Sequence, residues 1–209
     1  MEILLATTNP GKLREFSDLL GSEIINWRTL GDFPGITTID ETGSTFRANA
    51  ILKAGGYAKA TNRWTLADDS GLEVDALSGQ PGIHSARWAL QHDAGSGDLA
   101  NNDLLLKQLQ STPDDLRGAR FVCVLALADP IGRIILTARD TVAGRILRAA
   151  VGGGGFGYDP LFYIDALQKT TAQLPPHEKH QISHRGKALR RLKCLMDRID
   201  LENVVKGWV

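Results

Sequence analysis

The N-terminal sequence ILLATTNPGK, residues 3–12, is an apolar run that leads into small and polar residues. The four apolar residues at its start predict a buried strand, and Pro10-Gly11 predicts a turn after it. Apolar residues then recur at helical spacing, at Leu13, Phe16, Leu19 and Leu20. A strand that passes through a tight turn into a helix is a building unit of α/β sheets, so this stretch sets the fold class.

The same turn has the composition of an anion-binding site. The side chains of Thr7, Thr8 and Asn9 can cap free N–H groups at the start of the helix. Backbone donors, the positive end of the helix dipole and the Lys12 ammonium would then point at one place, as they do in many phosphate sites. Capped turns that bind nothing are also common in α/β proteins, and the turn alone does not choose between these interpretations.

Two better-known phosphate-binding motifs do not fit the chain. The nucleotide-triphosphatase loop requires an earlier glycine and a Ser or Thr directly after its Gly-Lys pair, where this chain has Ala6 and Leu13. The glycine-rich run at 152–157 matches the dinucleotide-binding pattern by letter. It is followed by Tyr158-Asp159-Pro160 rather than by an apolar helix, so the match is accidental.

Length, charge and cysteine content limit the classes of function. The chain has 209 residues, 43% of them hydrophobic, which suits a single domain over residues 1–209 with two lobes. Its 24 basic and 24 acidic residues balance, which argues against a nucleic-acid polymer or a membrane surface as the main partner. The longest apolar run, 121–128, is too short to cross a membrane, and a strand from Ile3 leaves no room for a signal peptide. Cys123 and Cys194 suit reduced thiols, so we expect a cytoplasmic location.

Hydrophobic periodicity predicts the remaining elements. We expect helices at 44–60, 98–109 and about 183–199, and strands at 23–27, 64–67, 120–128, 133–138 and 142–147, with a half-exposed strand at 72–76. The strand at 64–67 should end at Asp68-Asp69-Ser70-Gly71, which places an acidic pair at a strand end. Alternating strands and helices followed by hairpins predict an α/β fold with a mixed sheet.

The acidic pair has two interpretations. Asp and Ser before a glycine can simply build a turn. Alternatively, Asp68 and Asp69 together with Glu41 supply hard oxygen ligands of the kind that magnesium accepts, at a position where α/β sheets bind ligands. Glu41 could instead be an acid that the dipole of the following helix favours. On that helix Asn49 and Lys53 share one face.

A second group of chemically interesting residues follows the glycines at 152–155. In Phe156-Gly157-Tyr158-Asp159-Pro160, an aromatic ring beside bare backbone could stack on a flat base and hydrogen-bond its edge. The other interpretation is a core aromatic after a loop. Further along, Glu178-Lys179 and Ser183-His184-Arg185-Gly186 could form a basic loop in which Ser183 caps a helix.

Taken together and in order, these segments resemble the inosine triphosphate pyrophosphatase family, also called Ham1-like or non-standard purine nucleotide pyrophosphatases. The matching motifs run through nearly the whole chain: Ala6-Thr7-Thr8-Asn9-Pro10-Gly11-Lys12, Glu41-Thr42-Gly43, Asn49-Ala50-Ile51-Leu52-Lys53-Ala54, Ala67-Asp68-Asp69-Ser70-Gly71, Pro81-Gly82-Ile83, Ser85-Ala86-Arg87, Gly155-Phe156-Gly157-Tyr158-Asp159-Pro160, Glu178-Lys179 and Ile182-Ser183-His184-Arg185-Gly186. Their order and spacing, rather than any single motif, carry the resemblance.

The resemblance implies magnesium-dependent hydrolysis of ITP, dITP and XTP to the nucleoside monophosphate and pyrophosphate. It also implies a homodimer and an elongated two-lobed α/β fold, in which helices flank a mixed sheet and the nucleotide occupies a central cleft between the lobes. His84 stands where relatives more often carry Tyr or Arg, and His180 and Gln181 lie inside the loop from Lys179 to Ser183. These departures leave only fine substrate preference open.

By the same resemblance, the site residues divide into sets with different roles. The triphosphate would be held by Thr7, Thr8, Asn9, Pro10, Gly11 and Lys12. Magnesium would be bound by Glu41 and Asp69, and Asp69 would also be the general base for the attacking water. Lys53 and Ser70 would contact the nucleotide as well. The base pocket would be formed by Phe156, Gly157, Tyr158, Asp159, Lys179, His184 and Arg185.

Base selection would depend on the six-oxo group of hypoxanthine or xanthine. A donor from Arg185 or from backbone N–H would meet an oxygen there, but would face an amino group in adenine. Two alternatives to this function remain from the sequence: a Maf-like nucleotide pyrophosphatase with another base preference, and a nucleotide-binding module without catalysis. Pyrophosphate release from ITP with and without magnesium separates these alternatives.

Overall fold

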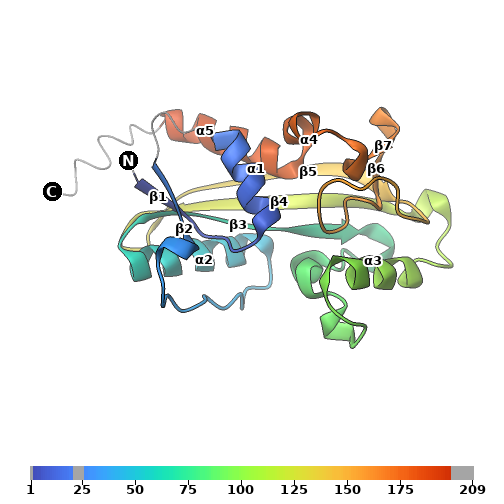
Figure 1. The fold of residues 1–209 in the computed structure, drawn as a ribbon, viewed down its shortest axis with the longest axis horizontal. Helices are drawn as coiled ribbons and strands as arrows, with labels where there is room; N and C mark the ends of the chain where they lie inside the picture. Colours follow the sequence, from blue (N-terminus) through green and yellow to red (C-terminus); the bar gives the residue numbers. More distant parts are fainter. Residues whose placement is uncertain (1, 21–25, 199–209) are drawn as a thin grey trace. The chain divides into compact units, whose positions relative to one another are not determined.

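A computed structural model describes residues 2–20 and 26–198 of the chain (Figure 1). The chain forms two compact units. Unit 1 comprises residues 1–69, 124–140 and 185–209, and unit 2 comprises residues 70–123 and 141–184. Because their residue ranges interleave, the chain passes from one unit to the other along three of its strands, β3 (Trp64–Val74), β4 (Gly118–Ala128) and β5 (Ile134–Ile146).

Within the described residues, seven strands follow the order β2-β1-β3-β4-β5-β6-β7. The others are β1 (Glu2–Leu5), β2 (Asn26–Thr29), β6 (Phe162–Ile164) and β7 (Lys169–Thr170). β1 runs parallel to both β2 and β3, with Leu5 opposite Leu66, whereas β6 is antiparallel to β5 and to β7. The sheet is therefore mixed, and the prediction of an α/β fold with a mixed sheet is confirmed.

Helices cover both faces of the strands in each unit. In unit 1, α2 (Phe46–Thr61) lies on one face and α5 (His184–Arg198) on the opposite face (Figure 1). In unit 2, α3 (Gly97–Gln108) and α4 (Pro176–Ile182) take opposite faces in the same way (Figure 1). α2 begins where the Thr45 hydroxyl accepts the Ala48 N–H at 3.1 Å, and it ends at Asn62 in the left-handed conformation.

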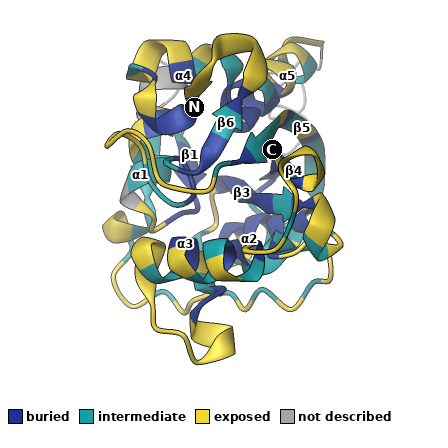
Figure 2. Ribbon diagram, turned by 90° about the vertical axis from the view of Figure 1, so that its right-hand side faces the viewer, coloured by how far each residue is buried: buried dark blue, intermediate teal, exposed yellow. Residues whose placement is uncertain are grey.

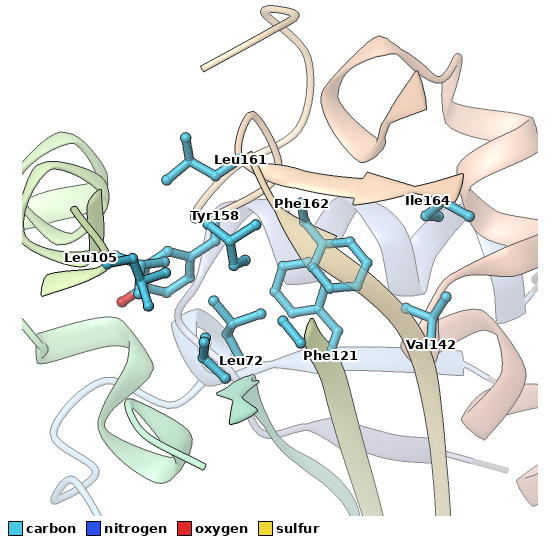
Figure 3. Close-up of a cluster of buried hydrophobic side chains, with 12 residues drawn as sticks. Leu72, Leu105, Phe121, Val142, Tyr158, Leu161, Phe162 and Ile164 are labelled. Carbon is cyan, nitrogen blue, oxygen red and sulfur yellow. The ribbon is translucent and has the colours of Figure 1, made fainter. Parts of the chain in front are cut away.

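Each unit buries its own apolar residues. Buried positions concentrate in β1, β3 and β4, whereas the outward sides of the helices are exposed (Figure 2). The core of unit 2 gathers side chains from β3, α3, β4, β5 and β6, with the rings of Phe121 and Phe162 4.5 Å apart (Figure 3). Tyr158 packs into this cluster beside Leu105 (Figure 3). Such aromatic pairs add about 0.5–1.5 kcal/mol beyond the area that they bury.

Most predicted elements are present, with shifted ends. The turn at residues 7–12 leads into α1 (Pro10–Leu20), and the two strands predicted at 133–138 and 142–147 form the single strand β5. Residues 23–25 and Ile199 of the predicted elements, and the side chains of Leu19 and Leu20, lie outside the described residues. The short elements α4, β6 and β7 were not predicted. None of the described helices is long and apolar enough to cross a membrane.

One prediction about the acidic pair is wrong. Asp68 and Asp69 do not end a strand, because β3 continues through Ser70 and Gly71 to Val74. Turn preference is weak when neighbouring strands pair with the segment, and here β1 and β4 flank β3. The pairing with β1 does stop just before the acids, since the Ala6 N–H donates to the Leu66 carbonyl at 2.8 Å. The carboxylates therefore lie where the β1 ladder ends, inside a strand that continues.

Candidate active site

The turn after β1 places Lys12 against the first carboxylate of the acidic pair. The Asn9 side chain accepts the N–H groups of Gly11 and Lys12 at 2.9 and 3.1 Å, so it caps α1. Thr7 in turn accepts the Asn9 N–H at 3.2 Å. With the helix start fixed, Lys12 Nζ lies 2.8 Å from Asp68 Oδ2. The predicted capping role is thus present, and it occupies two of the backbone donors that an anion would otherwise use.

The second carboxylate of the pair shares a cation with Glu41. Lys53, on α2, places its Nζ 3.1 Å from Asp69 Oδ1 and 2.9 Å from Glu41 Oε1. Asp69 and Lys53 are buried, and Glu41 is partly exposed. The two predicted magnesium ligands therefore converge on one ammonium group, which keeps them close together without forcing two carboxylates into contact.

Asn49 fixes the loop that carries Glu41. Its Oδ1 accepts the Gly43 N–H at 2.8 Å, and the residue is fully buried one helical turn before Lys53. A Cβ at Gly43 would come within 2.6 Å of the Ala48 Cβ and 2.7 Å of Asn49 Oδ1, so only glycine allows this close approach. Asn49 Nδ2 is buried and has no hydrogen-bond partner within the described residues. The shared face of Asn49 and Lys53 was predicted, but the role of Asn49 in holding the loop was not.

Arg185 joins the same cluster from α5. Its guanidinium is bonded to Glu15 on α1 through Nη1, and its Nη2 lies 3.7 Å from Asp68 Oδ2. Arg185 and Glu15 are both buried. Sequence reasoning missed Glu15, for which the only signal was a charged residue beside the core position Phe16. The resemblance implied a base-pocket role for Arg185, whereas its ion pairs with Glu15 and Asp68 lie within unit 1.

The neighbouring carboxylates have opposite pKa shifts. Burial acts to raise the pKa of Asp68, but Lys12, Arg185 and Lys53 outweigh it and hold that pKa below its ordinary value. Burial raises the pKa of Asp69, and the charge of Glu41 adds to this, although Lys53 and Lys12 act against it. Two adjacent acids whose environments push their pKa values apart are a typical acid–base arrangement. Asp68 is held as an anion, and Asp69 is the better proton acceptor.

The oxygen atoms of this cluster fit a divalent cation of the magnesium type. Asp69 Oδ2 is buried and has no hydrogen-bond partner within the described residues, while Glu41 brings a second carboxylate to the same ammonium. Magnesium takes one or two carboxylates and completes its shell with water and phosphate oxygens. Among the described residues no group of three or more His, Cys, Asp or Glu could hold a metal alone. The donor set therefore suits an ion that arrives with a phosphorylated ligand.

In unit 2, Asp159 organises the segment that carries Phe156. Its Oδ2 accepts the Phe156 N–H at 2.8 Å and the Lys179 ammonium at 2.6 Å, and its Oδ1 accepts the Thr171 hydroxyl at 2.8 Å. A Cβ at Gly155 would come within 2.1 Å of Asp159 Oδ2. Asp159 is thus surrounded by protein donors, and it holds Phe156 and Lys179 in place.

Phe156 and Lys179 lie together as a consequence. Lys179 Nζ is 5.0 Å from the centroid of the Phe156 ring, a distance at which a cation and an aromatic face attract each other. Phe156 is half-buried, whereas Lys179 and Asp159 are buried. Phe156, Asp159 and Lys179, which the resemblance implied for the base pocket, thus lie together in unit 2.

The remaining predicted residues have structural partners or exposed positions. His184 is buried and stacks on Phe121 with 4.9 Å between ring centroids. The Tyr158 hydroxyl donates to the Ser85 carbonyl at 2.9 Å, and burial, aided by the charge of Asp98, raises the pKa of Tyr158. Thr8 is exposed, Ser70 and Gly11 are half-buried, and the side chain of Pro10 lies outside the description.

Comparisons with known proteins identify the family of the chain. The sequence model of the Ham1 family matches residues 3–195. A dITP/XTP pyrophosphatase of Desulforamulus reducens is 47% identical over 208 residues, which cover 98% of this chain and 100% of the relative. A protein of the same name from Geobacillus kaustophilus is 48% identical over 191 residues, covering 91% of this chain and 92% of the relative.

Solved structures give the same result. A Ham1 protein from Coxiella burnetii has a TM-score of 0.85 and 40% identity, and the match covers 95% of this chain and all (100%) of that one. A nucleoside-triphosphatase, also named dITP/XTP pyrophosphatase, from Mycobacterium abscessus has a TM-score of 0.74 and 44% identity over 92% of this chain and 98% of that one. The resemblance seen in the motifs is confirmed, and the chain belongs to the Ham1 family.

Proposed function

We propose that the chain hydrolyses the triphosphates of deaminated purines, ITP, dITP and XTP, to the nucleoside monophosphate and pyrophosphate. The observation that carries this proposal is the pair Asp68 and Asp69, each of which lies against its own lysine: Lys12 is 2.8 Å from Asp68 and Lys53 is 3.1 Å from Asp69. The relatives named dITP/XTP pyrophosphatase, 47% and 48% identical to this chain, support the same activity.

Asp69 is the general base in this proposal. Lys53 holds its Oδ1 at 3.1 Å, which fixes the carboxylate that would take a proton from the attacking water. Burial raises the pKa of Asp69, whereas a magnesium ion on the same carboxylate would lower it. Asp68 remains ionised and orients Lys12 through their 2.8 Å contact.

Cations of unit 1 would hold the phosphates. We assign the triphosphate to Thr7, Thr8, Asn9, Pro10, Gly11 and Lys12, with Lys53 and Ser70 as further contacts. Lys12 would exchange part of its contact with Asp68 for a phosphate oxygen, because both offer anionic oxygens to the ammonium. Glu41 and Asp69 would hold Mg²⁺. When bound, the ion neutralises phosphate charge and orients the reacting groups.

Residues of unit 2 would read the base. The Phe156 ring would stack on the purine, and Gly157, Tyr158, Asp159 and His184 would shape the surroundings of that ring. Lys179, held 5.0 Å from the ring centroid, would offer a donor to the six-oxo group of hypoxanthine or xanthine. The amino group of adenine at the same position is itself a donor and cannot accept this hydrogen bond. A site built on such a bond rejects the analogue that cannot make it.

The resemblance implied that Arg185 reads the base, but its ion pairs favour another role. It is bonded to Glu15 and lies 3.7 Å from Asp68, so we assign it to the stability and charge of the acidic cluster. Backbone N–H groups also contribute less to base reading than expected, because those of Phe156 and Asp159 donate to Asp159 Oδ2 and the Phe156 carbonyl.

The chain would work as a homodimer in the cytoplasm, where nucleoside triphosphates are made and used. The resemblance to Ham1-like enzymes supports the dimer, and Cys123 and Cys194, which form no disulfide among the described residues, suit a reducing compartment. Light scattering of the purified protein would test the first proposal, and a mass near one chain would contradict it. Fractionation of cells tests the second.

The decisive experiment measures products. Purified protein is given ITP, XTP or ATP at equal concentration, with Mg²⁺ or with EDTA, and nucleoside monophosphate and pyrophosphate are quantified. We expect equal amounts of monophosphate and pyrophosphate from ITP and XTP, far less from ATP, and none with EDTA. Release of single phosphates, or equal rates with ITP and ATP, would contradict the proposal.

A further inference from the structure

Two polar residues of α3, one helical turn apart, bond to the main chain of Gly157. Asp98 Oδ2 accepts the Gly157 N–H at 2.6 Å, and Asn102 Nδ2 donates to the Gly157 carbonyl at 3.0 Å. Residues four apart on a helix lie on the same face, so the pair meets both polar groups of one residue. All three residues belong to unit 2.

Gly157 has no side chain of its own that could fix its conformation. Its φ is 61°, in the left-handed region that glycine adopts most readily, and a Cβ at this position would meet no atom within 4 Å. Asn102 is buried, whereas Asp98 is exposed at the start of α3. The hydrogen bonds to α3 therefore fix both polar groups of the Gly157 backbone.

The neighbours of Gly157 are held by other elements. Asp159 holds the Phe156 N–H, and Tyr158 donates to the Ser85 carbonyl. Ser85 itself accepts the Leu72 N–H of β3 at 2.8 Å, which connects the Pro81–Arg87 motif to the core of the unit. Each residue of the segment thus has its own anchor, and α3 supplies the anchor next to the Phe156 ring.

We propose that Asp98 and Asn102 are positioning residues for purine recognition, because they fix the Gly157 backbone and through it the orientation of the Phe156 ring. This inference rests on the proposed function, in which Phe156 stacks on the base. If the Phe156 ring becomes ordered only when the purine binds, the entropy cost of that ordering lowers the affinity for the nucleotide. The chemical step depends on Asp69, which neither residue touches. Loss of the α3 anchor should therefore raise KM and leave kcat nearly unchanged.

The test compares Asp98→Ala with Asp103→Ala. Asp103 is also an exposed aspartate of α3, and within the described residues it makes no hydrogen bond or ion pair. We expect Asp98→Ala to raise KM for ITP about fivefold, with kcat within about twofold of wild type, and Asp103→Ala to change neither. Asp98→Asn keeps an acceptor for the Gly157 N–H and should recover most of the loss. Asn102→Leu, which removes the donor to the carbonyl, should act in the same direction as Asp98→Ala.

A second readout does not depend on the substrate. Hydrogen exchange of a peptide spanning residues 152–160 should be faster in Asp98→Ala than in wild type and Asp103→Ala. Unchanged exchange, or faster exchange with unchanged KM, would overturn the inference. A fall in kcat and in melting temperature without a rise in KM would also overturn the inference, because it would show that Asp98 has a purely structural role. If wild type itself releases no pyrophosphate from ITP, the proposed function fails first, which is distinguishable from a failure of Asp98→Ala alone.

Discussion

The polar cluster of unit 1 and that of unit 2 are built in different ways. In unit 1, carboxylates and cations alternate: Glu41, Lys53 and Asp69 form one series, and Lys12, Asp68, Arg185 and Glu15 form the other. In unit 2, Asp159 forms an ion pair with Lys179 and also accepts hydrogen bonds from a backbone N–H and from a hydroxyl. The first arrangement suits charged phosphates and proton transfer, and the second suits the placement of a ring. The two clusters can therefore be broken separately.

The largest effect is expected at Asp69. Asp69→Asn keeps the shape of the side chain but removes the proton acceptor and the carboxylate charge beside Lys53. Turnover of ITP should fall about 10²-fold or more, as expected for loss of a general base. Initial rates of pyrophosphate release at saturating ITP and magnesium measure this loss, with Asp103→Asn as the surface control. A variant with normal melting and near wild-type turnover would show that Asp69 is not the base.

Arg185 tests whether the unit 1 cluster also supports stability. Arg185→Ala leaves the buried Glu15 without its cation, and removing one partner of a buried ion pair costs about 3–5 kcal/mol. Urea unfolding should show this loss, and Glu15→Gln in the Arg185→Ala background should restore part of it.

The same variant separates the two roles considered for Arg185. If it serves the acidic cluster, ITP and ATP should be slowed alike, with their ratio of kcat/KM unchanged. An unchanged unfolding midpoint together with a lower ITP-to-ATP ratio would place Arg185 in the base pocket instead.

Asn49 should affect the magnesium requirement of the reaction rather than the choice of purine base. Asn49→Ala removes the acceptor of the Gly43 N–H and so loosens the loop that carries Glu41. Residues that orient a metal ligand typically contribute about tenfold or more to metal affinity. The magnesium concentration for half-maximal activity should rise by about tenfold. Arg47→Ala, an exposed change on the same helix, is the control, and an equal response of both variants would rule out this role for Asn49.

The sequence predicts local elements well where periodicity or capping decides them. The β1 strand, the Asn9 cap and the start of α2 follow from apolar runs and cap residues. The Asp68-Asp69-Ser70-Gly71 segment shows the limit of this approach. Its composition favours a turn, but it lies inside β3, whose other neighbour in the sheet, β4, is far away in the sequence. Local preference gives no information about such partners.

For the site, motif spacing indicates residues that do lie in polar clusters, but it does not indicate which partner each of them contacts. Lys12, Lys53, Asp69 and Lys179 are all found in polar clusters as the motifs indicated. The partner of Arg185 could not be predicted, because Glu15 lies 170 residues away in the sequence. The hold of α3 on Gly157 was missed for the same reason, since the Asp98 bond joins residues 59 apart.

The most direct test of the division between the clusters uses one substitution in each unit. Lys12→Met and Lys179→Met remove the same charge with the same change in shape. The ratio of kcat/KM for ITP over ATP is measured for both variants and wild type at one magnesium concentration. Lys12→Met should slow both substrates and leave the ratio within about twofold, because phosphates are common to both. Lys179→Met should lower the ratio by about fivefold, because it removes the donor to the six-oxo group. A changed ratio in Lys12→Met, or an unchanged ratio in Lys179→Met, would contradict the account.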